Sequence, residues 1–202
     1  MKLLFQGDSI TDCNRNRENP NDLGFGYVQK IQAALPNHVV INRGISGNRT
    51  IDLLMRWQTD TIDLQPDILS IFIGINEVWH YHFYQKVLTP SMFEDYYKNL
   101  LKQVKYLLPH TQIILIEPFV LPIGVYQKSW DVELFEEQAI VRKLSHMYNT
   151  HYVPLQDIIN EKLGKYKMDR IADDGVHPTD LGHEIIKDAI LEVIKPLLGE
   201  EE

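Results

Sequence analysis

The sequence predicts an α/β fold of three layers, in which a parallel sheet of five strands lies between helices on both faces. Short apolar runs alternate with amphipathic stretches along all 202 residues. This alternation is typical of strands and helices that wind into a parallel sheet. The strongest apolar runs are nearly continuous, as strands buried on both faces are. No internal repeat, low-complexity tract or long linker divides the chain, so we expect residues 1–202 to form one domain.

Five apolar segments are expected to be the strands. They lie at 2–6, 38–42, 68–74, 112–118 and 151–155. Joined through helices, they predict a sheet with flavodoxin-like connections, in which ligands bind beyond the carboxyl ends of the strands. The loops after Gln6, Asn42, Gly74 and Pro118, together with the segment before the last helix, are therefore the places to look for function.

Helices are expected at about 25–35, 50–64, 91–108, 131–149 and 179–198. Thr50 and Thr89 are placed to cap the second and third of these helices, and Pro90 suits a first helical turn. Thr179 is placed to cap the last helix, along which the apolar residues form one stripe.

Composition and charge narrow the range of partners. The formal net charge of −8 disfavours nucleic acid and anionic membranes, which are polyanions. Cys13 is the one cysteine, so neither an intrachain disulfide nor a cysteine metal cluster is possible. No apolar run approaches the roughly 20 residues that span a bilayer, and the first residues lack a signal-peptide pattern. We expect a cytoplasmic protein that acts on an uncharged small molecule, and exposed aromatic loops are compatible with a homo-oligomer.

The loop after the first strand, "GDSIT" at 7–11, has several interpretations. Its short polar side chains are suited to cap a turn, and its backbone N–H groups to bind phosphate. It lacks the glycines of a dinucleotide fingerprint, the lysine of a P-loop and the Gly-x-Ser-x-Gly elbow of α/β-hydrolases. A third interpretation is that Ser9 is a nucleophile, which requires a base, an orienting acid and oxyanion donors from elsewhere in the chain.

Two further loops offer donors. In "NRGISGN" at 42–48 the glycines permit close backbone approach, so the Gly47 N–H is either part of an ordinary turn or free for a ligand. In "IGINEVWH" at 73–80 Asn76 is either a turn residue or an amide donor.

The segment "DDGVHPTDLGH" at 173–183 contains two pairs of Asp-x-x-His. An aspartate three residues before a histidine in one turn is able to fix the tautomer of a histidine base. Because Thr179 is placed to cap the last helix, Asp180 and His183 fall in its first turns, where His183 is best interpreted as a helix-surface or packing residue. The pair Asp174 and His177 therefore gives the better base.

Taken in order, "GDSIT", "GISGN", "GIN" at 74–76 and "DGVHP" resemble the four blocks of the SGNH (GDSL-type) hydrolases. The resemblance covers nearly the whole chain. It implies a Ser9–His177–Asp174 triad, an oxyanion hole built from the N–H groups of Ser9 and Gly47 and the amide of Asn76, and no metal or organic cofactor. One position departs from the pattern: many members have aspartate after the asparagine, and this chain has Glu77.

Further stretches are similar to bacterial acetylxylan-type esterases: "GDSITDC", "GYV" at 26–28, "NRGISGN", "RW" at 56–57, "IGINEVW" and "EPF" at 117–119. This similarity implies hydrolysis of acetyl esters on carbohydrates such as xylooligosaccharides. The segments 77–90 and 119–131 are expected to be loops whose aromatic residues form a rim that stacks on sugar rings. The expected substrate contacts are Asp8, Trp79, Tyr126 and Trp130.

Other functions stay open at this point. An aromatic rim also suits an acyl chain, as in a lysophospholipase or thioesterase. A catalytically silent carbohydrate-binding protein and a phospho-acceptor protein with Asp8 at the first strand end are further alternatives. The histidines of "HYH" at 80–82 share a face if the segment is extended, but no third ligand is evident, so we predict no metal site.

Overall fold

The computed structural model, which describes residues 1–85 and 89–200, has five parallel strands in one sheet. These are β1 (Lys2–Gly7), β2 (Val39–Asn42), β3 (Ile68–Phe72), β4 (Gln112–Ile116) and β5 (His151–Val153). Their order, β2-β1-β3-β4-β5, is that of a flavodoxin-like sheet. The predicted fold class is confirmed, and each expected strand is present with ends that differ by one or two residues.

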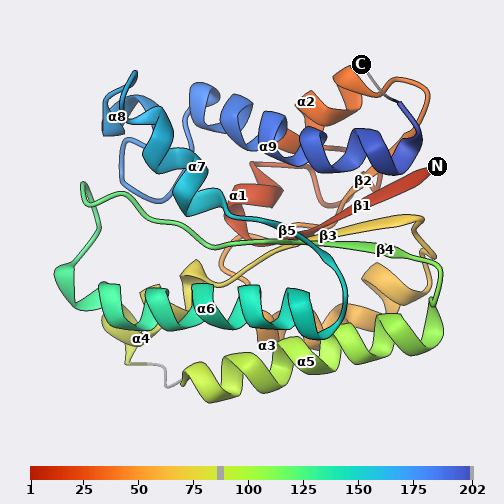
Figure 1. Cartoon of the computed structure of the whole chain (residues 1–202), viewed down its shortest axis with the longest axis horizontal. Coiled ribbons are helices and arrows are strands. Elements are labelled where there is room, and N and C mark those ends of the chain that lie inside the picture. The colour runs from red at the N-terminus through yellow and green to blue at the C-terminus, as the bar shows by residue number, and fades with distance from the viewer. Residues whose placement is uncertain (86–88, 201–202) are drawn as a thin grey trace.

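Helices cover both faces of the sheet (Figure 1). On one face lie α2 (Tyr27–Ala34), α7 (Leu155–Lys162), α8 (Met168–Ile171) and α9 (Asp180–Leu198). On the other lie α3 (Thr50–Trp57), α4 (Ile75–Tyr84), α5 (Pro90–Leu107) and α6 (Asp131–Met147). Within the described residues, none of the helices combines the length and apolar character that crossing a bilayer requires.

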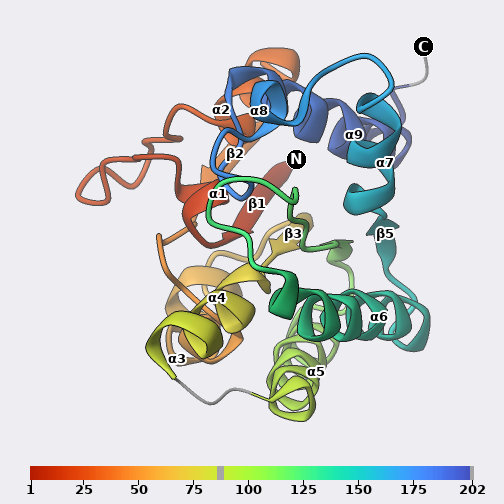
Figure 2. The same ribbon diagram turned by 90° about the vertical axis from the view of Figure 1, so that its left-hand side faces the viewer.

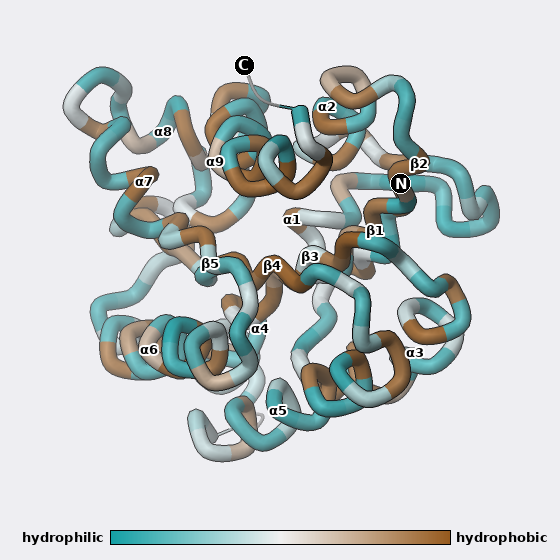
Figure 3. Tube along the Cα trace, turned by 45° about the vertical axis from the view of Figure 1, so that its right-hand side comes forward, coloured by the Kyte–Doolittle hydropathy of each residue, from teal (hydrophilic) through white to brown (hydrophobic). Residues whose placement is uncertain are grey.

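Alternation along the strands divides the core in two. Leu3 and Phe5 pack with the residues of α2 and α9, whereas Leu4 between them packs with those of α3 and α5. The trace is correspondingly hydrophobic where β3 and β4 cross the middle of the molecule (Figure 3). In β1, β3 and β4, burial on both faces is thus the reason that the sequences are almost continuously apolar.

Two of the three expected helix caps are present. The Thr89 hydroxyl accepts from the Met92 N–H, with Pro90 at the start of α5, and the Thr179 hydroxyl accepts from the Gly182 N–H at the start of α9. The expectation for Thr50 is wrong, because Arg49 is the cap residue of α3 and Thr50 is its buried first residue. The helix expected over 50–64 is an α-helix only as far as Trp57. Gln58–Ile62, which follow directly, form a single π-helical turn.

Four helices lie where none was expected: α1 (Ser9–Asp12), α4, α7 and α8. A 3₁₀ turn, η2 (Lys128–Trp130), precedes α6. The loop expected over 77–90 is therefore wrong for residues 77–84, which belong to α4, whereas residues 86–88 lie outside the described part of the chain. On a helix His80 and His82 are about 200° apart, so they do not share the face that an extended segment would give them.

The carboxyl end of β1 meets that of β3, where Gly7 is the register partner of Phe72. The chain turns into α1 after β1 and into α4 after β3, so Ser9 and Asn76 leave the sheet from neighbouring strands. In this strand order the connections change direction at this pair of strands, and ligands of such sheets bind at that point. Figure 2 views the molecule from this end, with α1, α4 and the segment before α9 facing the reader.

Candidate active site

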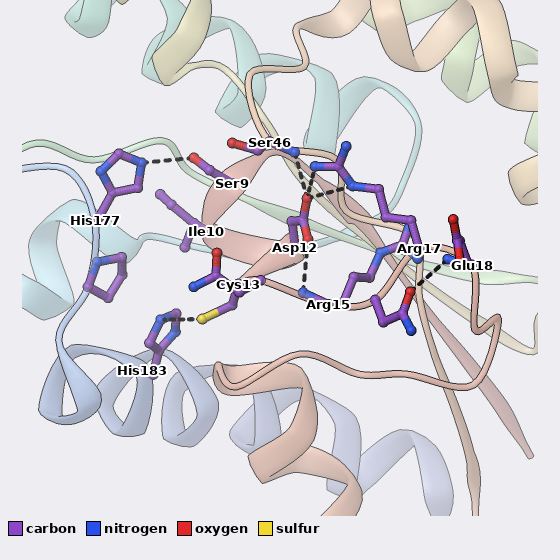
Figure 4. A pocket seen from close by; sticks show the side chains of 13 residues that line it. Ser9, Ile10, Asp12, Cys13, Arg15, Arg17, Glu18, Ser46, His177 and His183 are labelled. Carbon is purple, nitrogen blue, oxygen red and sulfur yellow. Dashed lines mark hydrogen bonds and ion pairs between the residues drawn. The ribbon is translucent and has the colours of Figure 1, made fainter.

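Ser9 and His177 meet at this edge of the sheet. Ser9 is the first residue of α1, where the Asp8 side chain accepts from the Ile10 N–H and holds the turn. His177 lies in the segment that precedes α9. The Ser9 Oγ is 3.0 Å from the His177 Nε2 (Figure 4). Two side chains 168 positions apart in sequence are thus within hydrogen-bonding distance.

Asp174 completes a chain of three side chains. Its Oδ2 is 2.7 Å from the His177 Nδ1, and its Oδ1 accepts from the N–H groups of Val176 and His177. Partial burial opposes ionisation, but the hydrogen bonds from His177 and Val176 outweigh it and hold the pKa of Asp174 below its ordinary value. A charged Asp174 accepts the Nδ1–H of His177, so the His177 Nε2 faces Ser9 as a proton acceptor.

The loop at 44–50 leaves one backbone N–H without a partner. The other N–H groups of this loop each donate to an acceptor. The pairs are Gly44 to Asn42 Oδ1, Ile45 to Gly7 O, Ser46 to Asp12 Oδ2, Asn48 to Ile45 O, Arg49 to Asp52 Oδ2, and Thr50 to Glu77 Oε1. For Gly47 the described residues supply no acceptor. Gly47 has φ +79°, and the position of a Cβ there would have no neighbour within 4 Å. Its N–H is therefore held in place and available to a ligand.

Two more N–H groups keep a hydrogen without an acceptor among the described residues. The Ser9 N–H, at the first helical position of α1, has no acceptor among the described residues, as is usual for the start of a helix. The side-chain amide of Asn76 donates one hydrogen to the Asn48 carbonyl oxygen at 3.1 Å, which leaves the second hydrogen for a ligand. The segments that follow β1, β2 and β3 thus each carry one N–H donor without an acceptor among the described residues.

A cleft of about 730 Å³ opens in front of Ser9 and His177 (Figure 4). Its lining includes Asn14, Asn16 and Glu18 from the segment after α1, and Ser46 from the loop at 44–50. Most of the residues that line it have polar side chains. Its acidic and basic residues are equal in number, with Asp12 and Glu18 against Arg15 and Arg17. The side chains of the cleft thus offer both donors and acceptors of hydrogen bonds.

Asp12 and Arg15 connect the segment after α1 to the loop at 44–50. In the sequence, only their closeness to Ser9 indicates this role. Asp12 accepts from the Ser46 N–H at 2.9 Å and pairs with Arg17. Arg15 donates from its Nε to the Gly44 carbonyl oxygen at 2.9 Å. The segment after α1 and the loop that carries Gly47 are therefore fixed to each other.

The four residues that were expected to contact the substrate differ in their distance from the cleft and in their burial. The Trp79 ring lies 5.9 Å from the His177 ring, so Trp79 does border the site. Asp8 is 2% exposed and Trp130 is fully buried, and the structure contradicts a contact between either and a substrate. Trp130 instead packs against Trp79, with ring centroids 5.6 Å apart. Tyr126 lines a separate hollow and donates to Asp131, so it does not reach the cleft.

His183, the histidine of the second Asp-x-x-His pair, is a packing residue and does not lie on the helix surface. His183 is 5% exposed, its ring stacks on Tyr27, and its Nδ1 accepts from the Tyr27 N–H. Burial lowers the pKa of His183 to about 4, assisted by the charge of Lys30, so the ring is neutral at pH 7. Its Nε2 then carries the proton and faces the Cys13 Sγ at 3.4 Å.

A second contact of serine, histidine and acid occurs where η2 and α6 meet α4, and sequence reasoning missed it. The His82 Nδ1 is 3.2 Å from the Ser129 Oγ, and the His82 Nε2 is 3.4 Å from the Glu133 Oε2. None of these residues lines the cleft in front of Ser9. Within the described residues, no group of three or more histidine, cysteine or acidic side chains is arranged to hold a metal ion.

Comparison with known proteins agrees with this geometry. The model of the GDSL-like lipase/acylhydrolase family matches residues 5–185. An acetylxylan esterase of Geobacillus stearothermophilus is 36% identical over 96% of this chain and 93% of its own length. The crystal structure of that bacterium's acetylxylan esterase Axe2 superposes with a TM-score of 0.85 at 36% identity, covering 96% of this chain and 93% of the other.

A crystal structure from Parabacteroides merdae, described as that of a GDSL-like lipase, superposes with a TM-score of 0.88. It is 36% identical and covers 95% of this chain and 94% of the other. Family match, relative and solved structures all extend over most of the chain. The chain therefore belongs to the GDSL-like lipase/acylhydrolase family and is a carboxylic ester hydrolase.

Proposed function

We propose that this esterase removes small acyl groups, acetyl above all, from carbohydrates such as xylooligosaccharides, with Ser9 as its nucleophile. The observation that carries the proposal is the continuous chain from Ser9 through His177 to Asp174, which opens into a polar cleft. The acetylxylan esterase relative supports the choice of acyl group and acceptor.

In the first step, the Ser9 Oγ attacks the acyl carbon while the His177 Nε2 takes the Ser9 proton. The contact of 3.0 Å between these atoms suits that transfer. Asp174 stays ionised, keeps the His177 tautomer and stabilises the imidazolium that forms. His177 then gives its proton to the sugar oxygen as the ester bond breaks, and an acyl-Ser9 intermediate is left.

In the second step, water attacks the acyl-enzyme, with His177 again as the base, and the carboxylic acid is released. In both steps negative charge develops on the acyl oxygen. The N–H groups of Ser9 and Gly47 and the Asn76 amide are the proposed oxyanion donors, and each such donor typically contributes 10²–10³-fold to turnover. No metal or organic cofactor is needed for this chemistry.

The cleft favours a sugar over a long acyl chain. Sugars present hydroxyl groups in several directions, and Asn14, Asn16 and Ser46 in the lining both donate and accept hydrogen bonds. A long alkyl chain in the same place would separate these polar groups from water without replacing their hydrogen bonds. The acyl group is accordingly expected to be small and the alcohol polar.

Relative rates on two series of esters test this proposal. We expect kcat/KM to fall along p-nitrophenyl acetate, butyrate, octanoate and palmitate, with acetate at least about 10-fold above octanoate. Acetylated xylooligosaccharides should release acetate faster than acetylated alcohols without a ring. A rise in kcat/KM toward the longer acyl chains would refute the assignment and favour the lysophospholipase or thioesterase alternative. A folded protein that hydrolyses none of these esters would favour the silent carbohydrate-binding protein.

A further inference from the structure

Glu77 lies between the segment that carries Asn76 and the loop that carries Gly47, which supply two of the three proposed oxyanion donors. It follows Asn76 at the start of α4 and is 1% exposed. Its Oε1 accepts from the Thr50 N–H at 2.5 Å and from the Thr50 hydroxyl at 2.7 Å. Thr50 is itself fully buried and comes three residues after Gly47. One side chain therefore joins the segment that carries Asn76 to the loop that carries Gly47.

A second bond joins the same two segments, from the Asn76 amide to the Asn48 carbonyl oxygen. The Asn76 bond lies at the surface end of the contact, since Asn76 is 7% exposed, and the Glu77 bonds lie behind it. With the two bonds side by side, neither segment is able to pivot about the other. The relative placement of the Gly47 N–H and the Asn76 amide thus depends on Glu77.

The other oxygen of Glu77 has no partner. Glu77 Oε2 and Glu137 Oε2 are both buried without a hydrogen bond from the described residues. Glu137, on α6, is 2% exposed, and its Oε2 lies 3.1 Å from the position that a Cβ of Gly74 would occupy. Two carboxyl groups therefore enclose the turn from Gly74 to Glu77.

Buried groups from four segments surround Glu77. They are Thr50 on α3, Asp8 directly after β1, Tyr97 on α5 and Glu137 on α6, of which Asp8 and Glu137 are acids. Burial raises the pKa of Glu77 to about 8, with hydrogen bonds from Thr50 acting against it and the charge of Asp8 adding to it. Burial, followed by the charges of Glu77 and Glu133, raises the pKa of Glu137 well above its ordinary value.

We propose that Glu77 acts as a neutral carboxylic acid and as a positioning residue, which fixes the Gly47 N–H and the Asn76 amide at the spacing that the oxyanion needs. The inference rests on the proposed function of those two donors. A neutral carboxyl accepts both Thr50 bonds through its carbonyl oxygen and places no negative charge behind a site where negative charge develops. Ionised, the same group would oppose the oxyanion.

The test compares Glu77→Gln, Glu77→Ala and the matched control Glu137→Gln in kcat, KM and pH profile on p-nitrophenyl acetate. Glutamine has the shape of a neutral glutamic acid and retains the acceptor for Thr50, so Glu77→Gln should keep kcat within about 3-fold at pH 7. Glu77→Ala should lower kcat roughly 10- to 100-fold, less than the 10²–10³-fold of a lost donor, with KM changed by less than about 2-fold. Glu137→Gln removes an equally buried acid that has no contact with Thr50 and should leave kcat unchanged.

The pH profile separates positioning from general stability. The wild type should lose kcat as the pH rises through about 8. Glu77→Gln should retain kcat over the same range. Glu137→Gln should show the same loss as the wild type. Thermal unfolding shows whether each variant is folded, and if Glu77→Ala does not fold, the profile of Glu77→Gln decides.

Unchanged kcat in folded Glu77→Ala would overturn the inference, as would an equal loss in Glu77→Gln and Glu77→Ala, or an alkaline loss that persists in Glu77→Gln. The proposed function fails separately, if the wild type hydrolyses no ester or if its hydrolysis does not require Ser9.

Discussion

Replacing Ser9 by alanine is expected to lower kcat for acetyl ester hydrolysis by roughly 10⁵–10⁶-fold. Alanine has no oxygen to attack the acyl carbon, so no acyl-enzyme forms, and His177 is left with only water to activate. The remaining rate would come from the oxyanion donors and substrate binding alone. The measurement is the turnover of p-nitrophenyl acetate by purified protein, with thermal unfolding recorded in parallel.

The fold should survive this change. Ser9 is only partly buried, and its side-chain bond to His177 lies at the protein surface, so its loss should cost about 1 kcal/mol or less in unfolding free energy. Ser129→Ala is the matched control, because Ser129 also contacts a histidine, His82, but lies away from the cleft. It should keep full activity. Normal turnover in Ser9→Ala, or loss of turnover in Ser129→Ala, would refute the assignment of the nucleophile.

Replacing Asp174 by asparagine is the second large effect, with kcat lowered by roughly 10⁴-fold. The asparagine side chain is able to present its amide to the His177 Nδ1, which then accepts a hydrogen bond and leaves the proton on Nε2. A protonated Nε2 cannot take the Ser9 proton. The loss should appear in kcat, with KM almost unchanged, because Asp174 does not line the cleft.

Asp173→Asn is the control for this variant, since Asp173 is the exposed neighbour of Asp174 and forms no part of the chain to Ser9. It removes the same charge from the same loop. If Asp173→Asn lost as much activity as Asp174→Asn, the effect would arise from the charge of the loop and not from the orientation of His177. Equal activity of Asp174→Asn and wild type would exclude Asp174 from the triad.

The strands β1, β3 and β4 are predictable from the sequence because burial on both faces requires nearly continuous apolar runs. The strand ends are less predictable, because they depend on tertiary contacts. The third strand was expected to reach Gly74 but ends at Phe72, and Gly74 has φ +145°, which an extended strand does not allow. The caps at Thr89 and Thr179 are predictable since they require only local hydrogen bonds.

Helix α4 shows why the rest could not be predicted. Its residues include valine, tryptophan, tyrosine and phenylalanine, which have low helix propensity and favour strands. The helix places Trp79, His82 and Phe83 against Trp130, with ring centroids 5.6 to 6.3 Å apart. That packing involves residues about 50 positions apart and leaves no pattern in the local sequence. The same packing buries Trp130, so its expected contact with substrate was wrong.

The position of His177 relative to the start of α9 could be predicted from the sequence, whereas the status of individual N–H groups could not. Thr179 as a helix cap was enough to separate His177 from His183, and the structure places only His177 beside Ser9. Gly47 alone has an unpaired N–H in its loop because five other segments supply acceptors to its neighbours, among them Asp12 and Glu77. Short motifs identify such loops but do not show which of their atoms are already bonded.

The most direct test of the account is covalent labelling of the folded protein with a fluorophosphonate, followed by mass spectrometry of its peptides. The account predicts one label per chain, on Ser9, because the Ser9 hydroxyl faces a base whose tautomer Asp174 fixes. Labelling should disappear in Ser9→Ala, slow strongly in Asp174→Asn and persist in Ser129→Ala. Folded wild-type protein that takes no label, or takes it on Ser129 in place of Ser9, would contradict the account.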